Sequence, residues 1–254
     1  MLQLDQLKPA LDEGWITSVL RAVKSGKEAS VYLCQGSDRS GERLVAAKVY
    51  RQRRTFSHDA EYWEGATRSW GRRLNVAAAK RTAFGREVRF GGWIQREFET
   101  LRTLHGAGAS VPRPIAVAGD VLLLGWIGDE EGAAPPLHSL RADAAALDEL
   151  LRQVEIFLTH DVVHGDLSEY NVLVWDERPV VIDFPQASDP RFNRSAQTLL
   201  ERDLRNLARY FERVGVEFDW RRHASALWRR WLNSELGGDD TPAAEDWEFW
   251  QQFV

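Results

Sequence analysis

The sequence predicts a two-lobed α+β fold, with a strand-rich first lobe and a mainly helical second lobe. Residues 29–34 and 44–50 are strand-like, 121–127 is a further apolar strand, and helical patterns dominate after it. The chain has 254 residues, of which 44% are hydrophobic and 28% charged, so it can bury a sizeable core. We therefore expect a single domain over residues 1–254.

The first lobe should begin with helical segments and then change to strands. Residues 4–24 space their leucines and valines as a helix does, with interruptions at Pro9 and Gly14. The two strands that follow are joined by a polar turn at 36–41. Residues 51–92 contain several glycines and no sustained strand pattern, which predicts an insertion that is partly helical and partly mobile.

A helix is expected at residues 93–104, ended by Gly106 and Gly108. The side chains that should share its inner face are Trp93, Glu97, Leu101 and Leu104. An extended link at 111–114 then leads to the buried strand at 121–127. The second lobe should contain two helices within about 137–160, a hairpin of strands 172–174 and 180–182 with its turn at 176–179, and helices at about 195–213 and 221–236.

The overall composition is that of an ordinary globular protein, and its net charge of −5 gives no general reason to expect nucleic acid binding. Cys34 is the only cysteine, no apolar run is as long as a membrane span, and the first residues lack a signal-peptide pattern. We expect a cytoplasmic protein without a membrane partner. Residues 51–96 hold eleven Arg or Lys against four Asp or Glu, and form either a solvated loop or a surface for an acidic partner.

The strongest functional prediction comes from polar residues at 163–171 and 182–184. Asp166 precedes Asn171 by five residues, and Asp183 follows twelve residues later. In phosphoryl transfer of the kinase type, one carboxylate accepts the proton of the attacking hydroxyl, while an amide oxygen and a second carboxylate hold Mg²⁺ against the ATP phosphates. We expect Asp166 to be catalytic and Asn171 and Asp183 to bind metal, at the two ends of the hairpin, in a protein-kinase-like fold.

Lys48 lies in the apolar strand 44–50, where a lysine is costly unless its charge is paired. It either reaches water from an edge strand or contacts the ATP phosphates and is oriented by a helix glutamate, for which Glu97 is the candidate. The segment 25–32, which precedes the Lys48 strand, contains Gly26 and Ser30 and predicts a loop that covers phosphates, although a plain β-turn has the same pattern.

Five motifs together resemble the RIO family of atypical serine kinases, over residues 25–211. They are Gly-Lys-Glu-Ala-Ser-Val-Tyr at 26–32, Ala-Ala-Lys-Val-Tyr-Arg at 46–51, Val-Pro-Arg-Pro at 111–114, His-Gly-Asp-Leu-Ser-Glu-Tyr-Asn at 164–171 and Ile-Asp-Phe-Pro-Gln at 182–186. The resemblance implies a serine/threonine protein kinase that uses ATP and Mg²⁺, with Mn²⁺ as an alternative metal. It also implies autophosphorylation.

By this similarity Asp166 is the catalytic aspartate. Asp183 matches an aspartate that RIO proteins use in an aspartyl-phosphate ATPase cycle, so it is expected to be catalytic as well. The resemblance assigns further residues to the ATP site: Lys48, Glu97 and Ser30, with Leu124 as gatekeeper and Trp126 and Ile127 in the hinge.

The resemblance also implies a division of the chain. The first lobe should cover about 1–124 with the insertion at 51–92, the hinge about 125–128, and the second lobe about 129–254. The insertion matches a RIO loop in which autophosphorylation is common, and the short stretch before Ser25 matches the branch without an N-terminal winged helix. The implied partners are ATP and a serine/threonine substrate or the protein itself, with a ribosomal particle or RNA at residues 51–96.

Two departures from ordinary protein kinases have physical consequences. Gly165 stands where an arginine would receive a phosphorylated activation loop, so that switch lacks its receptor. Pro185 stands where a glycine permits a backbone flip, and its fixed φ should discourage that flip. About ten residues separate Pro185 from the next helix, so we expect no peptide-binding activation segment.

Two other functions are compatible with the phosphoryl-transfer motif. The first is a small-molecule kinase of the aminoglycoside or choline phosphotransferase type, which usually carries a large helical substrate domain after the hinge. The second is a nucleotide-regulated binding module in ribosome assembly.

Some residues are expected to be structural. We expect His164 to pack under the catalytic loop, and Asp203 either to anchor that loop or to lie exposed on a helix. The pairs Trp228/Trp231 and Trp247/Trp250 have helical spacing and either pack onto the core or form a partner-binding stripe. Residues 237–240 between the pairs predict a linker.

Overall fold

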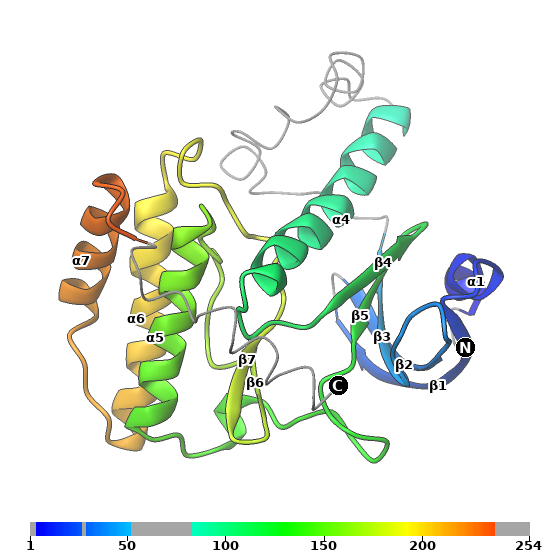
Figure 1. The fold of residues 1–254 in the computed structure, drawn as a ribbon, viewed down its shortest axis with the longest axis horizontal. Coiled ribbons are helices and arrows are strands. Elements are labelled where there is room, and N and C mark those ends of the chain that lie inside the picture. Colours follow the sequence, from blue (N-terminus) through cyan, green and yellow to red (C-terminus); the bar gives the residue numbers. More distant parts are fainter. Residues whose placement is uncertain (1–3, 27–28, 52–82, 237–254) are drawn as a thin grey trace.

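A five-stranded antiparallel sheet and a group of long helices form the two lobes of the protein (Figure 1). The computed structural model describes residues 4–26, 29–51 and 83–236. The sheet has the order β1-β2-β3-β5-β4. Its strands are β1 (Ile16–Ser25), β2 (Ala29–Gly36), β3 (Leu44–Tyr50), β4 (Pro114–Ala118) and β5 (Val121–Gly125).

The two faces of the sheet are covered by different helices. Helix α1 (Leu4–Asp12) packs Leu7 and Ala10 against one face. Helix α4 (Ala83–Gly106) crosses the other face and lies between the sheet and the second lobe (Figure 1). Along the central strand β3, alternate residues therefore face α1 or α4, and Lys48 and Tyr50 share the α4 side.

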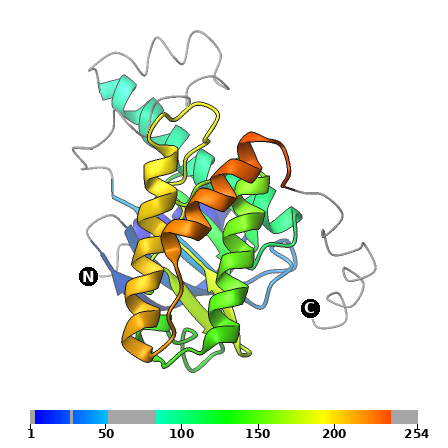
Figure 2. The same cartoon turned by 90° about the vertical axis from the view of Figure 1, so that its left-hand side faces the viewer.

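Up to residue 236, where the description of the chain ends, the second lobe contains three helices, a short 3₁₀ turn and a hairpin. They are η1 (Leu137–Ser139), α5 (Ala144–Thr159), β6 (Val172–Trp175), β7 (Arg178–Val181), α6 (Ala196–Val214) and α7 (Trp220–Leu232). Figure 2 shows α5, α6 and α7 grouped on one side of the molecule. Phe157 and Phe211 belong to the same buried cluster as Leu104 of α4 and Leu122 of β5, so one hydrophobic cluster includes residues of both lobes.

Three elements differ from the sequence predictions. Residues 16–24 form strand β1 and not a helix, because this edge strand is mostly exposed and three register shifts against β2 break its alternation. Residues 137–160 contain one α-helix and not two. The first part forms only the 3₁₀ turn η1, and α5 begins after Asp143, which accepts a hydrogen bond from Ala146 N. Strand β4 was missed, since the predicted extended link covers only 111–114 and β4 begins at its last residue, Pro114.

The remaining elements agree with the predictions, with shifted ends. Helix α4 starts at Ala83, ten residues before the expected start, within a glycine-containing segment that the sequence predicts only in part as helix. The β6–β7 hairpin turns at Asp176 and Glu177, whose φ angles of 47° and 63° are those of a tight two-residue turn. Across the described ranges, no helix has the length and apolar character of a membrane span.

The first tryptophan pair packs onto the core, which was one of the two interpretations of its spacing. The rings of Trp228 and Trp231 lie 4.8 Å apart and contact the main buried cluster. The second pair, Trp247 and Trp250, and the predicted linker at 237–240 lie outside the described residues.

Candidate active site

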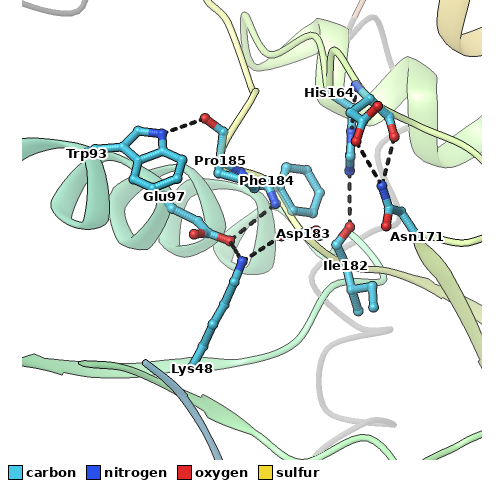
Figure 3. Close-up of polar contacts among 10 residues, drawn as sticks. Lys48, Trp93, Glu97, His164, Asn171, Ile182, Asp183, Phe184 and Pro185 are labelled. Carbon is cyan, nitrogen blue, oxygen red and sulfur yellow. Dashed lines mark hydrogen bonds and ion pairs between the residues drawn. The ribbon is translucent and has the colours of Figure 1, made fainter. Parts of the chain in front are cut away.

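Lys48 lies between two carboxylates that come from different parts of the fold (Figure 3). Its Nζ donates to Glu97 Oε1 of α4 at 2.7 Å and to Asp183 Oδ1, just after β7, at 2.6 Å. Lys48 and Glu97 are almost inaccessible, with side chains 12% and 2% exposed, while the Asp183 side chain is 43% exposed. Lys48 is therefore paired with the predicted helix glutamate and is not an edge-strand lysine that reaches water, while its contact with phosphate stays a prediction.

The charges in this cluster depend on one another. Burial disfavours the Lys48 ammonium, but Glu97 and Asp183 together raise its pKa above the usual value. Burial likewise disfavours the Asp183 carboxylate, yet Lys48 holds its pKa below the usual range. Burial raises the pKa of Glu97, against the attraction of Lys48 and the hydrogen bond from Phe184 N. The stable arrangement is a protonated Lys48 beside an ionised Asp183.

Asp166 and Asn171 are joined within the loop of residues 163–171, the predicted catalytic loop. Asn171 Nδ2 donates to Asp166 O at 2.9 Å and to Asp166 Oδ2 at 3.3 Å. Asp166 is exposed, so its carboxylate can meet a hydroxyl group from solvent. The hydrogen bond from Asn171 fixes the direction of that carboxylate, as a general base requires.

The hairpin brings the two expected metal ligands together. Ile182 N donates to Asn171 O at 2.9 Å, which continues the β6–β7 ladder by one pair and places Asn171 beside the residue before Asp183. The amide nitrogen of Asn171 is used by Asp166, so its oxygen is the atom left for a cation. An amide oxygen and a partly exposed carboxylate fit Mg²⁺, which prefers oxygen ligands and keeps open positions for water and phosphate.

A buried carboxylate holds the catalytic loop from below. Asp203 of α6 is 2% exposed and accepts hydrogen bonds from Gly165 N at 2.8 Å and Leu167 N at 2.9 Å. The anchoring interpretation of Asp203 is therefore correct. Sequence reasoning missed two neighbours: Arg202 donates to Gly165 O, and Asn206 Nδ2 donates to Leu167 O at 3.1 Å. The available signal was the spacing of four residues between Arg202 and Asn206, which places both on one face of α6.

Gly165 is required by the backbone that passes over it. Its φ is +77°, and a Cβ at this position would lie 2.6 Å from Gln186 O. The absence of the kinase arginine is therefore a packing requirement here, because any side chain at position 165 would collide with the segment after Asp183.

His164 is a structural residue, as expected. It is 2% exposed, and burial lowers its pKa to about 4, so the ring is neutral near pH 7. Nδ1 accepts a hydrogen bond from Asp166 N at 3.2 Å, which leaves the proton on Nε2, 3.1 Å from Ile182 O (Figure 3). His164 thus ties the catalytic loop to the strand that leads to Asp183.

The expected roof and hinge residues belong to the sheet, to the turn between β1 and β2 and to the residues after β5. Gly26 N donates to Ala29 O at 2.9 Å and closes the turn between β1 and β2. Ser30 is 4% exposed, and its Oγ lies 3.4 Å from Arg51 Nη2. Leu124 lies in β5, and the residues that follow, Trp126 and Ile127, lead into the second lobe. A role in nucleotide binding stays a prediction for these residues.

The segment between Asp183 and α6 is short and closely held. Val163 and Ser188 exchange two backbone hydrogen bonds, at 2.9 and 2.8 Å, and α6 begins at Ala196. The described residues 184–195 therefore contain no long activation segment, in agreement with the sequence.

The comparisons with known proteins give one family. A family model described as RIO domain matches residues 30–223. A RIO-type serine/threonine-protein kinase Rio1 of Haloferax volcanii is 34% identical over 212 residues, which is 82% of this chain and 68% of that protein. A Rio1 of Thermoplasma acidophilum is 29% identical over 71% of this chain and 91% of its own length. The RIO1 kinase of Chaetomium thermophilum is 29% identical, and this chain spans 42% of its length.

A solved structure agrees with this result at the level of the fold. The Rio2 kinase of Chaetomium thermophilum, in a complex with ADP, Mg²⁺ and a phosphoaspartate, matches with a TM-score of 0.61 at 20% identity. The match covers 93% of this chain and 66% of that structure. The two-lobed kinase-like fold is thereby confirmed. The family model and the curated relatives do not favour the small-molecule kinase or the binding-module alternative.

The contact of Gly165 with Gln186 predicts the effect of a methyl group. Gly165→Ala should lower the free energy of unfolding by several kcal/mol, because strain at positive φ, about 1–2 kcal/mol, adds to a backbone collision. Gly215→Ala is the matched control, since its φ is +90° and nothing lies within 4 Å of its Cβ. Urea unfolding of both variants measures the difference, and equal losses would show that the contact is not tight.

The buried Asp203 predicts a dependence of stability on pH. Burial raises its pKa from 3.8 to about 7, against the hydrogen bonds from Gly165 and Leu167. A carboxyl group whose pKa is raised by folding stabilises the folded state below its unfolded pKa, and this stabilisation is lost as pH rises through about 7.

The measurement is the free energy of unfolding of wild type and Asp203→Asn at about pH 5 and about pH 8. Relative to Asp203→Asn, the free energy of unfolding of the wild type should fall by on the order of 2 kcal/mol between the lower and the higher pH. His164 titrates in both proteins, so its contribution cancels. Parallel pH profiles would contradict a raised pKa for Asp203.

Proposed function

The chain belongs to the RIO family, and we propose that it transfers the γ-phosphoryl group of ATP to a serine or threonine hydroxyl. One observation carries the proposal. A single set of contacts joins Lys48, Glu97 and Asp183, and the hairpin connects that set to Asp166 and Asn171. These five side chains supply the charges and the amide oxygen that phosphoryl transfer requires, and they come from both lobes.

Asp166 orients and deprotonates the attacking hydroxyl. Its carboxylate is exposed and is held by Asn171 Nδ2, so it can accept a hydrogen bond from an incoming hydroxyl and then its proton. The hydroxyl oxygen forms the new bond to phosphorus while the bond to the leaving ADP breaks.

Lys48 supplies a fixed positive charge for the phosphates. Glu97 holds its ammonium from the helix side, so the charge need not be reorganised when ATP binds. Asn171 and Asp183 would hold Mg²⁺ through their oxygens. When bound, Mg²⁺ neutralises phosphate charge that the protein alone leaves uncompensated.

Several finer assignments belong to the same proposal. Gly26 and Ser30 form the roof of the nucleotide site, and Leu124, Trp126 and Ile127 form its gatekeeper and hinge. The lobes divide at about 125–128, Mn²⁺ is an alternative metal, and the protein is cytoplasmic. The basic segment 51–96, of which 52–82 lie outside the described residues, would contact a ribosomal particle or RNA.

The Asp166 carboxylate can be tested by an isosteric change. Asp166→Asn keeps the size of the side chain and an oxygen for Asn171, but removes the base, so phosphoryl transfer should fall by at least about 100-fold. Transfer is followed in a single turnover with γ-labelled ATP. Asp148→Asn, an exposed position on α5, is the matched control and should keep wild-type activity.

The position of the labelled phosphate separates the proposed uses of the site. Label that is stable to hydroxylamine lies on a serine or threonine, whereas label that hydroxylamine releases lies on a carboxylate such as Asp183. Label on small alcohols alone, or equal activity of Asp166→Asn and wild type, would contradict the proposed function.

A further inference from the structure

Helix α4 makes a second contact with the Asp183 segment, one turn away from Glu97. The indole Nε1 of Trp93 donates a hydrogen bond to Pro185 O at 2.8 Å (Figure 3). Glu97 accepts one from Phe184 N at 3.2 Å. Trp93 and Glu97 are four residues apart and share a face of α4, so two successive residues after Asp183 are bound by the same helix.

The backbone of Asp183 needs such support. Its φ is +71°, in the left-handed region that an aspartate occupies at a cost of about 1–2 kcal/mol. Pro185 has no N–H, so its carbonyl is the only backbone group through which this residue can be held by hydrogen bonding. The bond from Trp93 uses that carbonyl.

Trp93 is itself fixed from the sheet side. Its ring lies 5.0 Å from the ring of Tyr50, at an interplanar angle of 59°. Tyr50 is 1% exposed, and the Lys48 ammonium lies 5.0 Å from its ring centroid. Lys48 and Tyr50 are two residues apart on the same face of β3, as Asp183 and Pro185 are two residues apart on their segment.

Two connections therefore run side by side from β3 to the Asp183 segment. The first is ionic and passes from Lys48 directly to Asp183. The second is neutral and passes from Tyr50 through Trp93 to Pro185. The ionic connection includes the group that would contact phosphate, because two of the three donors of the Lys48 ammonium are used by Glu97 and Asp183 and the third is left for the nucleotide. The neutral connection does not involve a group that ATP would bind.

We propose that Trp93 is a positioning residue for phosphoryl transfer. Its indole N–H holds Pro185, and through it the Asp183 carboxylate, in the direction that binds Mg²⁺ with ATP. The inference rests on the proposed function, because Asp183 has this role only in a site that uses Mg²⁺ and ATP. The indole does not titrate, so its hydrogen bond to Pro185 O requires neither phosphorylation nor a particular pH.

Trp93→Phe tests the hydrogen bond, since it keeps an aromatic ring against Tyr50 and removes the donor. A hydrogen bond of ordinary strength corresponds to a factor of about 3–10 in an equilibrium constant. The Mg²⁺ concentration needed for half-maximal ADP binding, measured by calorimetry, should rise by that factor. Hydrogen exchange at the Phe184 amide should accelerate similarly.

Trp231→Phe is the matched control. It removes an indole donor of the same kind, from Trp231 Nε1 to Asp161 Oδ1 at 3.0 Å, on α7 in the second lobe. It should leave the Mg²⁺ dependence and the Phe184 exchange unchanged, even if both variants lose the same thermal stability. A purely structural role of Trp93 would give the same binding result for the two variants, which would overturn the inference.

Two further outcomes keep the inference separate from the proposed function. If the wild type binds no ADP at any Mg²⁺ concentration, the proposed phosphoryl transfer is contradicted. Hydrogen exchange at the Phe184 amide would still test whether Trp93 positions this segment. If Trp93→Phe does not fold, the indole N–H of Trp93 is followed in the wild type by nuclear magnetic resonance. It should exchange slowly, and more slowly with Mg²⁺ and ADP, whereas fast exchange would overturn the inference.

Discussion

The ammonium group of Lys48 is the point on which the rest of the site depends. It is nearly inaccessible, so it is tolerated only because Glu97 and Asp183 both accept its hydrogen bonds. Glu97 belongs to α4 and Asp183 to the segment after β7 in the second lobe. The need to pair the charge of Lys48 therefore holds both this helix and this segment against β3. The antiparallel pairing of β3 between β2 and β5 keeps the lysine on the correct face.

The second lobe satisfies a matching requirement from below. Asp203 is buried and accepts two backbone hydrogen bonds from the catalytic loop, which sets the position of Asp166. Gly165 lets the segment after Asp183 pass close to that loop. Asp203 therefore positions the loop that carries Asp166, and Lys48 positions Asp183. His164 links the two parts through its contact with Ile182 O.

The sequence predicted the polar centre well because its chemistry is local. The spacing of Asp166, Asn171 and Asp183, and a lysine within an apolar strand, indicate the site without knowledge of the fold. Strand β1 was missed because an exposed edge strand with register shifts does not alternate. The contact of Trp93 with Pro185 was not predictable, because it joins residues 92 positions apart whose approach only the packed structure determines.

A crystal structure with Mg²⁺ and a non-hydrolysable ATP analogue tests the central claim most directly. We expect one Mg²⁺ bound by Asn171 Oδ1 and the Asp183 carboxylate, with Lys48 still paired to Glu97 and now in contact with phosphate. Helix α4 and residues 182–188 should keep their present positions. A metal bound without Asp183, or a Lys48 separated from Glu97 in the complex, would contradict the proposed site.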